Sequence, residues 1–210
     1  GTVYGEVHSE DHSLNYGNIS GTIGPIVDLG ASMVSLHPAI GGAVAMREDR
    51  FYYADVNVSA TFEGYLEGAY QWARFRAGYR QYDEDLTSDD GFYLDASGRY
   101  SKSDVLAEND VVSISPTIRW NEIDGTFNNN VNDFSPGKYV FGGVRLAYAR
   151  AINDLLTVEA SIKVDDRYFL VDKAPNGDDR QDVTITPGMS LLLKDVLGVQ
   201  TGLRFSYQYE

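Results

Sequence analysis

The sequence predicts an all-β fold, an antiparallel up-and-down arrangement of strands, and three observations support this prediction. Apolar and polar residues alternate over segments of about ten residues, which places one set of side chains on each face of a strand. These segments follow one another without a helical stretch of useful length between them. The links between them are alternately short and long, as in a series of antiparallel hairpins. At 210 residues, we expect a single domain covering residues 1–210.

The first predicted strands are the least regular. We expect them at 2–8, 18–27 and 31–37, where β-branched and aromatic residues recur but alternate poorly. The third strand is blurred by Pro38 and the glycines at 41–42, because proline cannot donate to a sheet ladder and glycine weakens a strand. The sequence therefore predicts that this strand ends at residue 37.

Eight further segments alternate clearly, and each justifies one strand. In 52–63, apolar even-numbered positions such as Val58 alternate with mainly polar odd-numbered positions such as Asp55. The same pattern recurs in 73–80, 92–101, 112–120, 139–148, 156–165, 183–191 and 199–209. Apolar positions in mid-strand, including Val144 and Leu203, are expected on the same face as Val58. The predicted path has eleven strands.

The links between the predicted strands form two groups. Short links are expected at 28–30, 67–71, 103–108, 152–155 and 194–198, and long polar links at 9–17, 38–50, 82–91, 121–137 and 166–181. Because the two kinds alternate, one end of the sheet should carry the large loops and the other end the tight turns. The large loops are rich in acidic and amide residues.

Composition and charge exclude several classes of function. The chain has 17 Lys+Arg against 31 Asp+Glu, a net charge of -14, which argues against nucleic-acid binding because phosphate contacts need cations. The absence of cysteine excludes disulfides, thiolate metal sites and cysteine nucleophiles. No run of about 18 apolar residues occurs, so no transmembrane helix is expected.

This architecture resembles the outer-membrane β-barrels of Gram-negative bacteria, which cross the membrane with alternating strands and carry short periplasmic turns and long external loops. The resemblance covers the whole chain and rests on architecture rather than on a diagnostic motif. It implies a transmembrane β-barrel of roughly 10–12 strands in the outer membrane, in contact with lipid and lipopolysaccharide. A count of eleven departs from the even number usual in this class. Either the irregular N-terminal region contains one strand fewer, which gives ten, or a twelfth strand is missing from the chain or supplied by other means.

Aromatic residues near the predicted strand ends agree with the aromatic girdles of such barrels. They are Tyr52, Tyr65, Tyr70, Trp72, Tyr79, Tyr82, Phe92, Tyr100, Trp120, Tyr139, Tyr148, Tyr207 and Tyr209.

A soluble antiparallel barrel or sandwich is the structural alternative, because its strands also alternate apolar and polar residues. Its strands usually have about five or six residues, fewer than most of the segments found here.

On the polar face of a barrel, charged side chains line the lumen. The predicted lining residues are Arg74, Arg76, Arg80, Arg99, Arg119, Arg145, Arg204, Asp55, Glu63 and Asp95, with Lys163, Glu159 and Asp165 on the same face. Pairing about the turn near Gly68 places Asp55 beside Arg80 and Glu63 beside Arg74. This pairing leaves Arg76, together with Arg99 or Arg119, as the free cations.

Three functions stay open from the sequence. The first is a narrow channel for small solutes with a weak preference for anions. The second is a structural or docking barrel that binds lipopolysaccharide or a protein partner through its acidic loops, with a lumen plugged by ion pairs. The third is a barrel hydrolase, but the three histidines, His8, His12 and His37, form no convincing catalytic arrangement, so no enzymatic activity is expected.

One acidic loop is the candidate for loose binding of a divalent cation. It contains Asp83, Asp85 and Asp89, and carboxylates at such spacing suit hard cations. The loop lacks the glutamate that closes an EF-hand site, so a solvated hairpin loop is the simpler interpretation. No cofactor is expected.

Overall fold

The chain forms one antiparallel sheet in the computed structural model, which describes residues 2–6, 16–30, 34–47, 50–83, 90–123, 137–153, 155–173, 179–196 and 199–206. The strands are β1 (Thr2–Glu6), β2 (Tyr16–Ile23), β3 (Val27–Asp28), β4 (Val34–Arg47), β5 (Arg50–Leu66), β6 (Ala69–Tyr82), β7 (Gly91–Ser103), β8 (Asp110–Ile123), β9 (Gly137–Ala151), β10 (Leu156–Lys173), β11 (Asp179–Val196) and β12 (Val199–Ser206). The all-β prediction is confirmed. Across the described ranges, no helix is long and apolar enough to cross a membrane.

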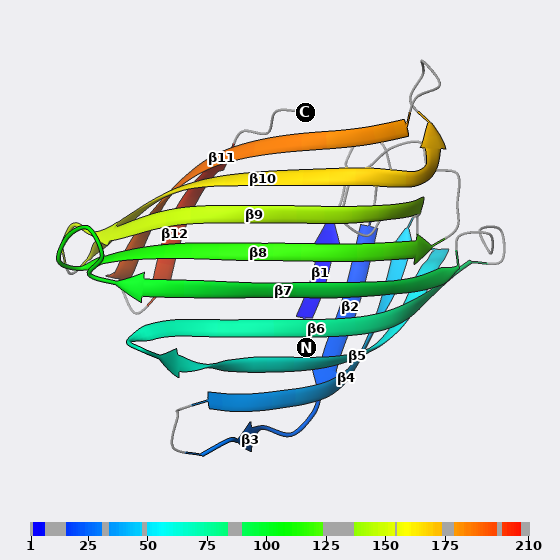
Figure 1. Cartoon of the computed structure of the whole chain (residues 1–210), viewed down its shortest axis with the longest axis horizontal. Coiled ribbons are helices and arrows are strands. Elements are labelled where there is room, and N and C mark those ends of the chain that lie inside the picture. Colours follow the sequence, from blue (N-terminus) through cyan, green and yellow to red (C-terminus); the bar gives the residue numbers. More distant parts are fainter. Residues whose placement is uncertain are drawn as a thin grey trace.

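The strands follow an up-and-down path in which sequence neighbours pair, in the order β1-β2-β4-β5-β6-β7-β8-β9-β10-β11-β12. Both β2 and β3 pair with β4, so β3 continues the edge that β2 begins. Counting β2 and β3 as one interrupted strand gives the predicted path of eleven. In Figure 1 the sheet curves so strongly that β1, β2 and β12 lie behind the wall formed by β6 to β10.

β4 is longer than the sequence predicts. The strand expected to end at residue 37 continues to Arg47, so the predicted long link 38–50 is wrong and only 48–49 separates β4 from β5. Pro38 is tolerated because it lies opposite the interruption between β2 and β3, which relaxes the demand for a ladder hydrogen bond. Gly41 is needed for packing, since a Cβ there would lie 2.8 Å from Asn57 Oδ1.

The hairpin of β10 and β11 is also longer than predicted. The expected link 166–181 shortens to 174–178 because the ladder continues through Arg167, opposite Asp182, and Tyr168, opposite Gln181. Alternation is lost in this stretch because both faces carry polar residues. The Gln181 amide, for example, donates to Asp166 at 2.9 Å.

The two ends of the sheet differ in their links, as the sequence predicts in part. One end, here called the loop end, carries the links 7–15, 48–49, 83–90, 124–136 and 174–178. The other, the turn end, carries 29–33, Glu67–Gly68, 104–109, 152–155 and 197–198. Three links at the loop end, 7–15, 83–90 and 124–136, are long as expected, whereas 48–49 and 174–178 are shorter than predicted.

The two faces of the sheet have opposite polarity and inverted burial. The apolar face carries Val58, Phe75 and Ile118, which are 55%, 57% and 56% exposed. The polar face carries the buried side chains of Asp55, Asn57, Arg80, Asp95, Arg119, Asn121 and Asp165. Proteins that fold in water normally bury apolar side chains and leave charged ones in solvent. This sheet does the reverse.

Aromatic side chains at the loop end form two small clusters on the polar face. One contains Ala45, Tyr53, Tyr82 and Tyr93, and the other contains Tyr139, Phe141 and Phe169. Tyr82 and Tyr139, expected in an exposed girdle, are 3% and 1% exposed, so that prediction is wrong for these two. Phe92 and Trp120 are exposed on the apolar face as expected. Tyr207 and Tyr209 lie outside the described residues.

Candidate functional site

Cross-strand register arranges the polar face in rows that run across the strands. One row contains Asn18, Ala45, Tyr53 and Tyr82. The next contains Asp55, Arg80 and Gly91. The row after that contains Asn57, Gly78, Tyr93, Asn121, Tyr139 and Phe169. A fourth contains Arg76, Asp95, Arg119, Phe141, Arg167 and Asp182. Because each strand contributes every second residue to this face, side chains distant in sequence become neighbours.

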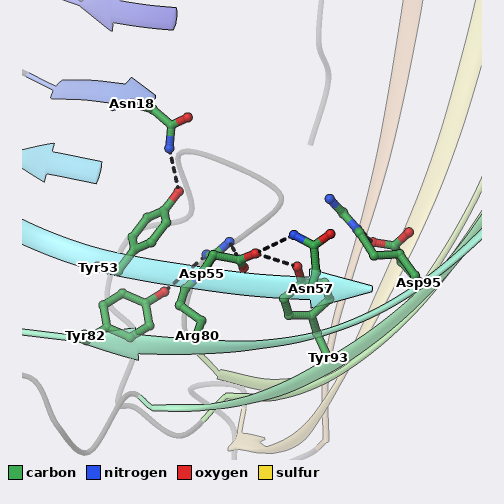
Figure 2. A network of polar contacts seen from close by, with 9 residues as sticks. Asn18, Tyr53, Asp55, Asn57, Arg80, Tyr82, Tyr93 and Asp95 are labelled. Atoms are coloured by element: carbon green, nitrogen blue, oxygen red, sulfur yellow. Dashed lines mark hydrogen bonds and ion pairs between the residues drawn. The ribbon is translucent and has the colours of Figure 1, made fainter. Parts of the chain in front are cut away.

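Asp55 lies at the centre of a buried group that we call the Asp55 network, formed with Asn57, Arg80 and Tyr93 (Figure 2). The Tyr93 hydroxyl and the Asn57 amide both donate to Asp55 Oδ1 at 2.9 Å. Arg80 Nη2 lies 3.4 Å from Asp55 Oδ2, and the two side chains are 3% and 4% exposed. The predicted pairing of Asp55 with Arg80 is confirmed. The pair offsets the cost of burying either charge, which is several kcal/mol for an isolated ion.

Two contacts in this region cross an intervening strand. Tyr93 on β7 reaches Asp55 on β5 over β6, and the Asn18 amide on β2 donates to the Tyr53 hydroxyl at 3.3 Å over β4. The crossing over β6 requires Gly78, where a Cβ would lie 2.4 Å from Tyr93 Cζ. Figure 2 shows these side chains on the inside of the curved strands, so the polar face is the concave one.

A second charged group lies beside the Asp55 network. Arg76 Nε donates to Asp95 Oδ2 at 2.7 Å, and Arg76 Nη2 contacts the same oxygen. The Arg76 guanidinium also lies 5.3 Å from the centre of the Tyr93 ring. Asp95 faces Arg76 on one side and Arg119 on the other. The prediction of Arg76 and Arg119 as free cations is therefore wrong. The β6–β7 register places Asp95 opposite Arg76, a pairing that was not predicted, and Arg119 also has an interaction partner.

Guanidinium groups stack on aromatic rings along the loop end. Arg80 lies 4.0 Å from the Tyr53 ring centre, Arg167 lies 4.8 Å from that of Tyr139, and Arg180 lies 4.3 Å from that of Phe169. Arg180 is also paired with Asp182 at 2.7 Å. Such cation–π contacts contribute about 2 kcal/mol when they are shielded from water. The loop end of the polar face is thus a continuous layer of rings and paired charges.

The part of the polar face nearer the turn end carries more hydroxyl groups and fewer rings. Arg145 is paired with Glu159 at 2.5 Å, and Lys163 with Asp165 at 2.6 Å. Arg99 Nε donates to Ser101 Oγ at 2.8 Å, and its Nη2 donates to Ser113 Oγ at 3.4 Å. No carboxylate within the described ranges forms an ion pair with Arg99, which agrees with its prediction as a free cation.

Glu63 is not paired with Arg74 as the sequence predicts. The register places Glu63 opposite Trp72, and Thr61 opposite Arg74. Arg74 instead donates through Nη2 to Ser97 Oγ at 3.5 Å. The predicted ion pair between Glu63 and Arg74 is therefore wrong, because the residue opposite Arg74 is two positions before Glu63 on β5.

Glu63 belongs to a small cluster with Ser35 and His37. His37 Nε2 lies 2.7 Å from Ser35 Oγ and 3.3 Å from Glu63 Oε1, and the Tyr70 hydroxyl donates to Glu63 at 3.3 Å. A Ser–His–acid triad needs the serine and the acid on different ring nitrogens, so that a proton can pass through the imidazole. Here both contacts use Nε2, and the cluster does not have the geometry of a hydrolase site.

Several predicted site residues fall partly or wholly outside the described residues. Arg204 lies opposite Ser190 in the β11–β12 ladder, and its side chain is not among the described ones. His8, His12, Asp85 and Asp89 also lie outside. Asp83 donates its backbone N–H to the Tyr52 carbonyl at 3.1 Å. Over the part of the chain that is described, no group of three or more His, Asp or Glu side chains is placed to hold a metal ion.

Several residues that shape the site were not among the predicted lining residues. They are Asn57, Tyr53, Tyr93, Asn121, Arg167 and Arg180. Their signal was present in the alternation, since Tyr53 and Tyr93 occupy positions of the same parity as Asp55 and Asp95 on their strands. The aromatic residues at odd positions of β5 and β7 belong to the concave face and not to a girdle.

At the opposite end of the strands, Asp110 holds the turn between β7 and β8. Its carboxylate accepts backbone N–H groups of Val105 at 2.9 Å, Leu106 at 3.0 Å and Ala107 at 2.8 Å. Burial raises the pKa of Asp110, but hydrogen bonds from these backbone groups and from Tyr148 outweigh it and hold the pKa below its ordinary value. The turn between β7 and β8 is therefore stabilised by hydrogen bonds to an ionised carboxylate.

The concave face presents guanidinium, carboxylate and hydroxyl groups at fixed positions, and such groups can form hydrogen bonds and ion pairs with charged ligands. No protein-family model matches the chain, and no curated protein matches it.

Proposed function

We propose that this chain is an outer-membrane β-barrel that forms a narrow channel for small solutes. The inverted burial of its two faces carries the proposal. Exposing apolar surface to water costs about 25 cal/mol per Å², and the apolar face exposes large side chains on every strand from β4 to β11. In a bilayer the same face would contact acyl chains, and the buried charges would face the interior.

The lengths of the strands support a membrane-spanning sheet. From β4 to β11 they have between 13 and 18 residues. A tilted transmembrane strand needs about 9–11 residues, whereas strands in soluble proteins most often have about five or six. Outer-membrane lipid and lipopolysaccharide are then the expected neighbours of the apolar face.

The concave face supports passage of solutes through the interior. Its turn-end part is lined with half-buried serines and threonines, among them Ser97, Ser115 and Thr117. These hydroxyls can replace the hydration of a polar solute. The layer of rings and paired charges at the loop end would make the passage narrow, because long side chains from neighbouring strands meet there.

A second candidate function is a structural or docking barrel with a closed interior, and the same loop-end layer favours it. Mutually paired charges such as Asp55 and Arg80 can fill an interior as well as line it. Such a barrel would present its external loops to a partner and conduct no ions.

Conductance in a planar bilayer tests the proposal. The purified protein, reconstituted from detergent, is expected to give stable single-channel steps. Thr117→Trp on the polar face should reduce the conductance, whereas Ile118→Trp, its neighbour on the apolar face, should leave it unchanged. Reconstituted protein without conductance would favour the docking barrel. Protein that stays monodisperse without detergent and does not enter micelles would exclude membrane insertion altogether.

A further inference from the structure

Arg74 occupies an unusual position on the polar face. In the register its neighbours on both sides are hydroxyl residues, Thr61 on β5 and Ser97 on β7. Its Nη2 lies 3.5 Å from Ser97 Oγ, and its Nε is buried without a hydrogen-bond partner in the described part of the chain. A guanidinium has five N–H donors, so most of the binding capacity of Arg74 is unused.

Arg99 lies next to Arg74 on the adjacent strand. Ser97 is opposite Arg74 and Trp72 is opposite Arg99, so the two arginines are diagonal neighbours on one face, with Cα atoms about 7–8 Å apart. Arg99 contacts the hydroxyls of Ser101 and Ser113. The two arginines thus share one region of the polar face, where the Arg74 guanidinium reaches Ser97 and the Arg99 guanidinium reaches Ser101 and Ser113.

The carboxylates nearest to this pair are already engaged. Asp95 forms its ion pair with Arg76, and the charges of Arg76, Asp95 and Arg119 all act on Arg74 from a distance. Glu63 contacts His37 and Tyr70. Across the described residues, neither Arg74 nor Arg99 forms an ion pair, so this part of the face carries two positive charges without a carboxylate in direct contact.

We propose that Arg74 forms a binding site for a small oxyanion, a carboxylate or phosphate group carried by a solute, with Arg99 as a second cation at the turn-end border of the site. The guanidinium fork matches the two oxygens of such a group, and Thr61, Ser97 and Ser113 supply further donors at the border. The inference rests on the proposed function in one respect, since a solute would reach this concave site through the barrel interior. If the chain forms a channel, this site would make it favour solutes that carry a carboxylate or phosphate group.

The direct test is calorimetric titration of inorganic phosphate and of acetate into the protein in detergent micelles, with choline chloride as the cation control. Phosphate and acetate should bind and choline should not. Arg74→Gln and Arg99→Gln should each weaken anion binding by about tenfold or more, because each removes hydrogen bonds between charged partners. Arg74→Lys, which keeps the charge and loses the fork, should bind with intermediate affinity.

The matched control is Lys102→Gln, which removes the same charge from an exposed position on the apolar face of β7. It should bind phosphate as the wild type does. Circular dichroism on every variant separates loss of binding from loss of folding. Equal binding by Lys102→Gln and a folded Arg74→Gln/Arg99→Gln double variant would overturn the site.

Conductance distinguishes failure of the site from failure of the proposed function. If phosphate binding depends on Arg74 and Arg99 but no conductance is seen, the site stands and the channel does not. If the wild type conducts without binding phosphate or acetate, and the double variant leaves the reversal potential unchanged, the channel stands and the oxyanion site is refuted.

Discussion

Gly78 allows Tyr93 to cross β6, and replacing it by alanine tests the architecture of the concave face. An added Cβ would lie 2.4 Å from both Cζ and the hydroxyl oxygen of Tyr93, and 2.7 Å from Cε1. Comfortable contacts between carbon atoms are about 3.5–4.0 Å, so the ring would have to move by more than about 1 Å. That displacement would break the hydrogen bond from Tyr93 to Asp55.

The cost of Gly78→Ala can be worked out from these contacts. Overpacking costs about 1–3 kcal/mol. Loss of a hydrogen bond to a charged group costs about 1.5–3 kcal/mol. Restricting the unfolded chain offsets about 0.4–1 kcal/mol. We expect a net destabilisation of about 2–5 kcal/mol.

Urea unfolding in detergent micelles, followed by the fluorescence of Trp72 and Trp120 and by circular dichroism, measures this free energy. The control is Gly142→Ala, at a strand glycine where an added Cβ meets nothing within 4 Å, and it should be neutral or slightly stabilising. In a Tyr93→Leu background the shorter side chain removes the clash, so Gly78→Ala should cost less than about 1 kcal/mol. An equal cost in both backgrounds, or equal costs at Gly78 and Gly142, would refute the reasoning.

Three further predictions concern charge. Arg80→Gln leaves Asp55 buried without its cation and should lower the unfolding free energy by about 3–5 kcal/mol, while Arg80→Gln/Asp55→Asn should recover part of it in the same urea assay. Ile185→Arg on the apolar face should destabilise the protein in lipid vesicles by about 2–4 kcal/mol, whereas Thr184→Arg on the polar face, opposite Asp165, should cost less; equal costs would contradict the face assignment. Because the folded pKa of Asp110 is depressed, its contribution is present above the unfolded value of about 4 and is lost as the pH falls through the folded pKa. The stability difference between wild type and Asp110→Asn should therefore shrink below about pH 4, and a difference independent of pH down to pH 2 would argue against an ionised cap.

The sequence predicted the strand path because alternation is a local property of the chain. Val58 and Val144 lie on the apolar face as expected, while the side chain of Leu203 is outside the described residues. The prediction failed where tertiary neighbours decide the conformation. Residues 38–47 continue β4 because Gly41 makes room for Asn57 and because Pro38 meets a gap in the next strand, and neither fact is visible in a single segment.

Pairing across strands was predicted correctly in one case and wrongly in another because register depends on the turn. Glu67 and Gly68 both have positive φ, at 51° and 75°, as in the two-residue turns that match the twist of a hairpin. This turn places Leu66 opposite Ala69, which fixes Asp55 opposite Arg80 and moves Glu63 away from Arg74. The sequence Glu-Gly is a weaker signal for this turn than Asn-Gly or Asp-Gly, so the exact register could not be derived.

The crossing of Tyr93 over β6 has a consequence for the order of folding. Asp55 takes its partners from three consecutive strands, since Arg80 belongs to β6 and Tyr93 to β7. The hairpin of β5 and β6 alone would leave the Asp55 carboxylate without the Tyr93 hydroxyl and open to solvent on that side. We expect β5, β6 and β7 to assemble as one cooperative unit, with strands added singly or in hairpins elsewhere in the sheet.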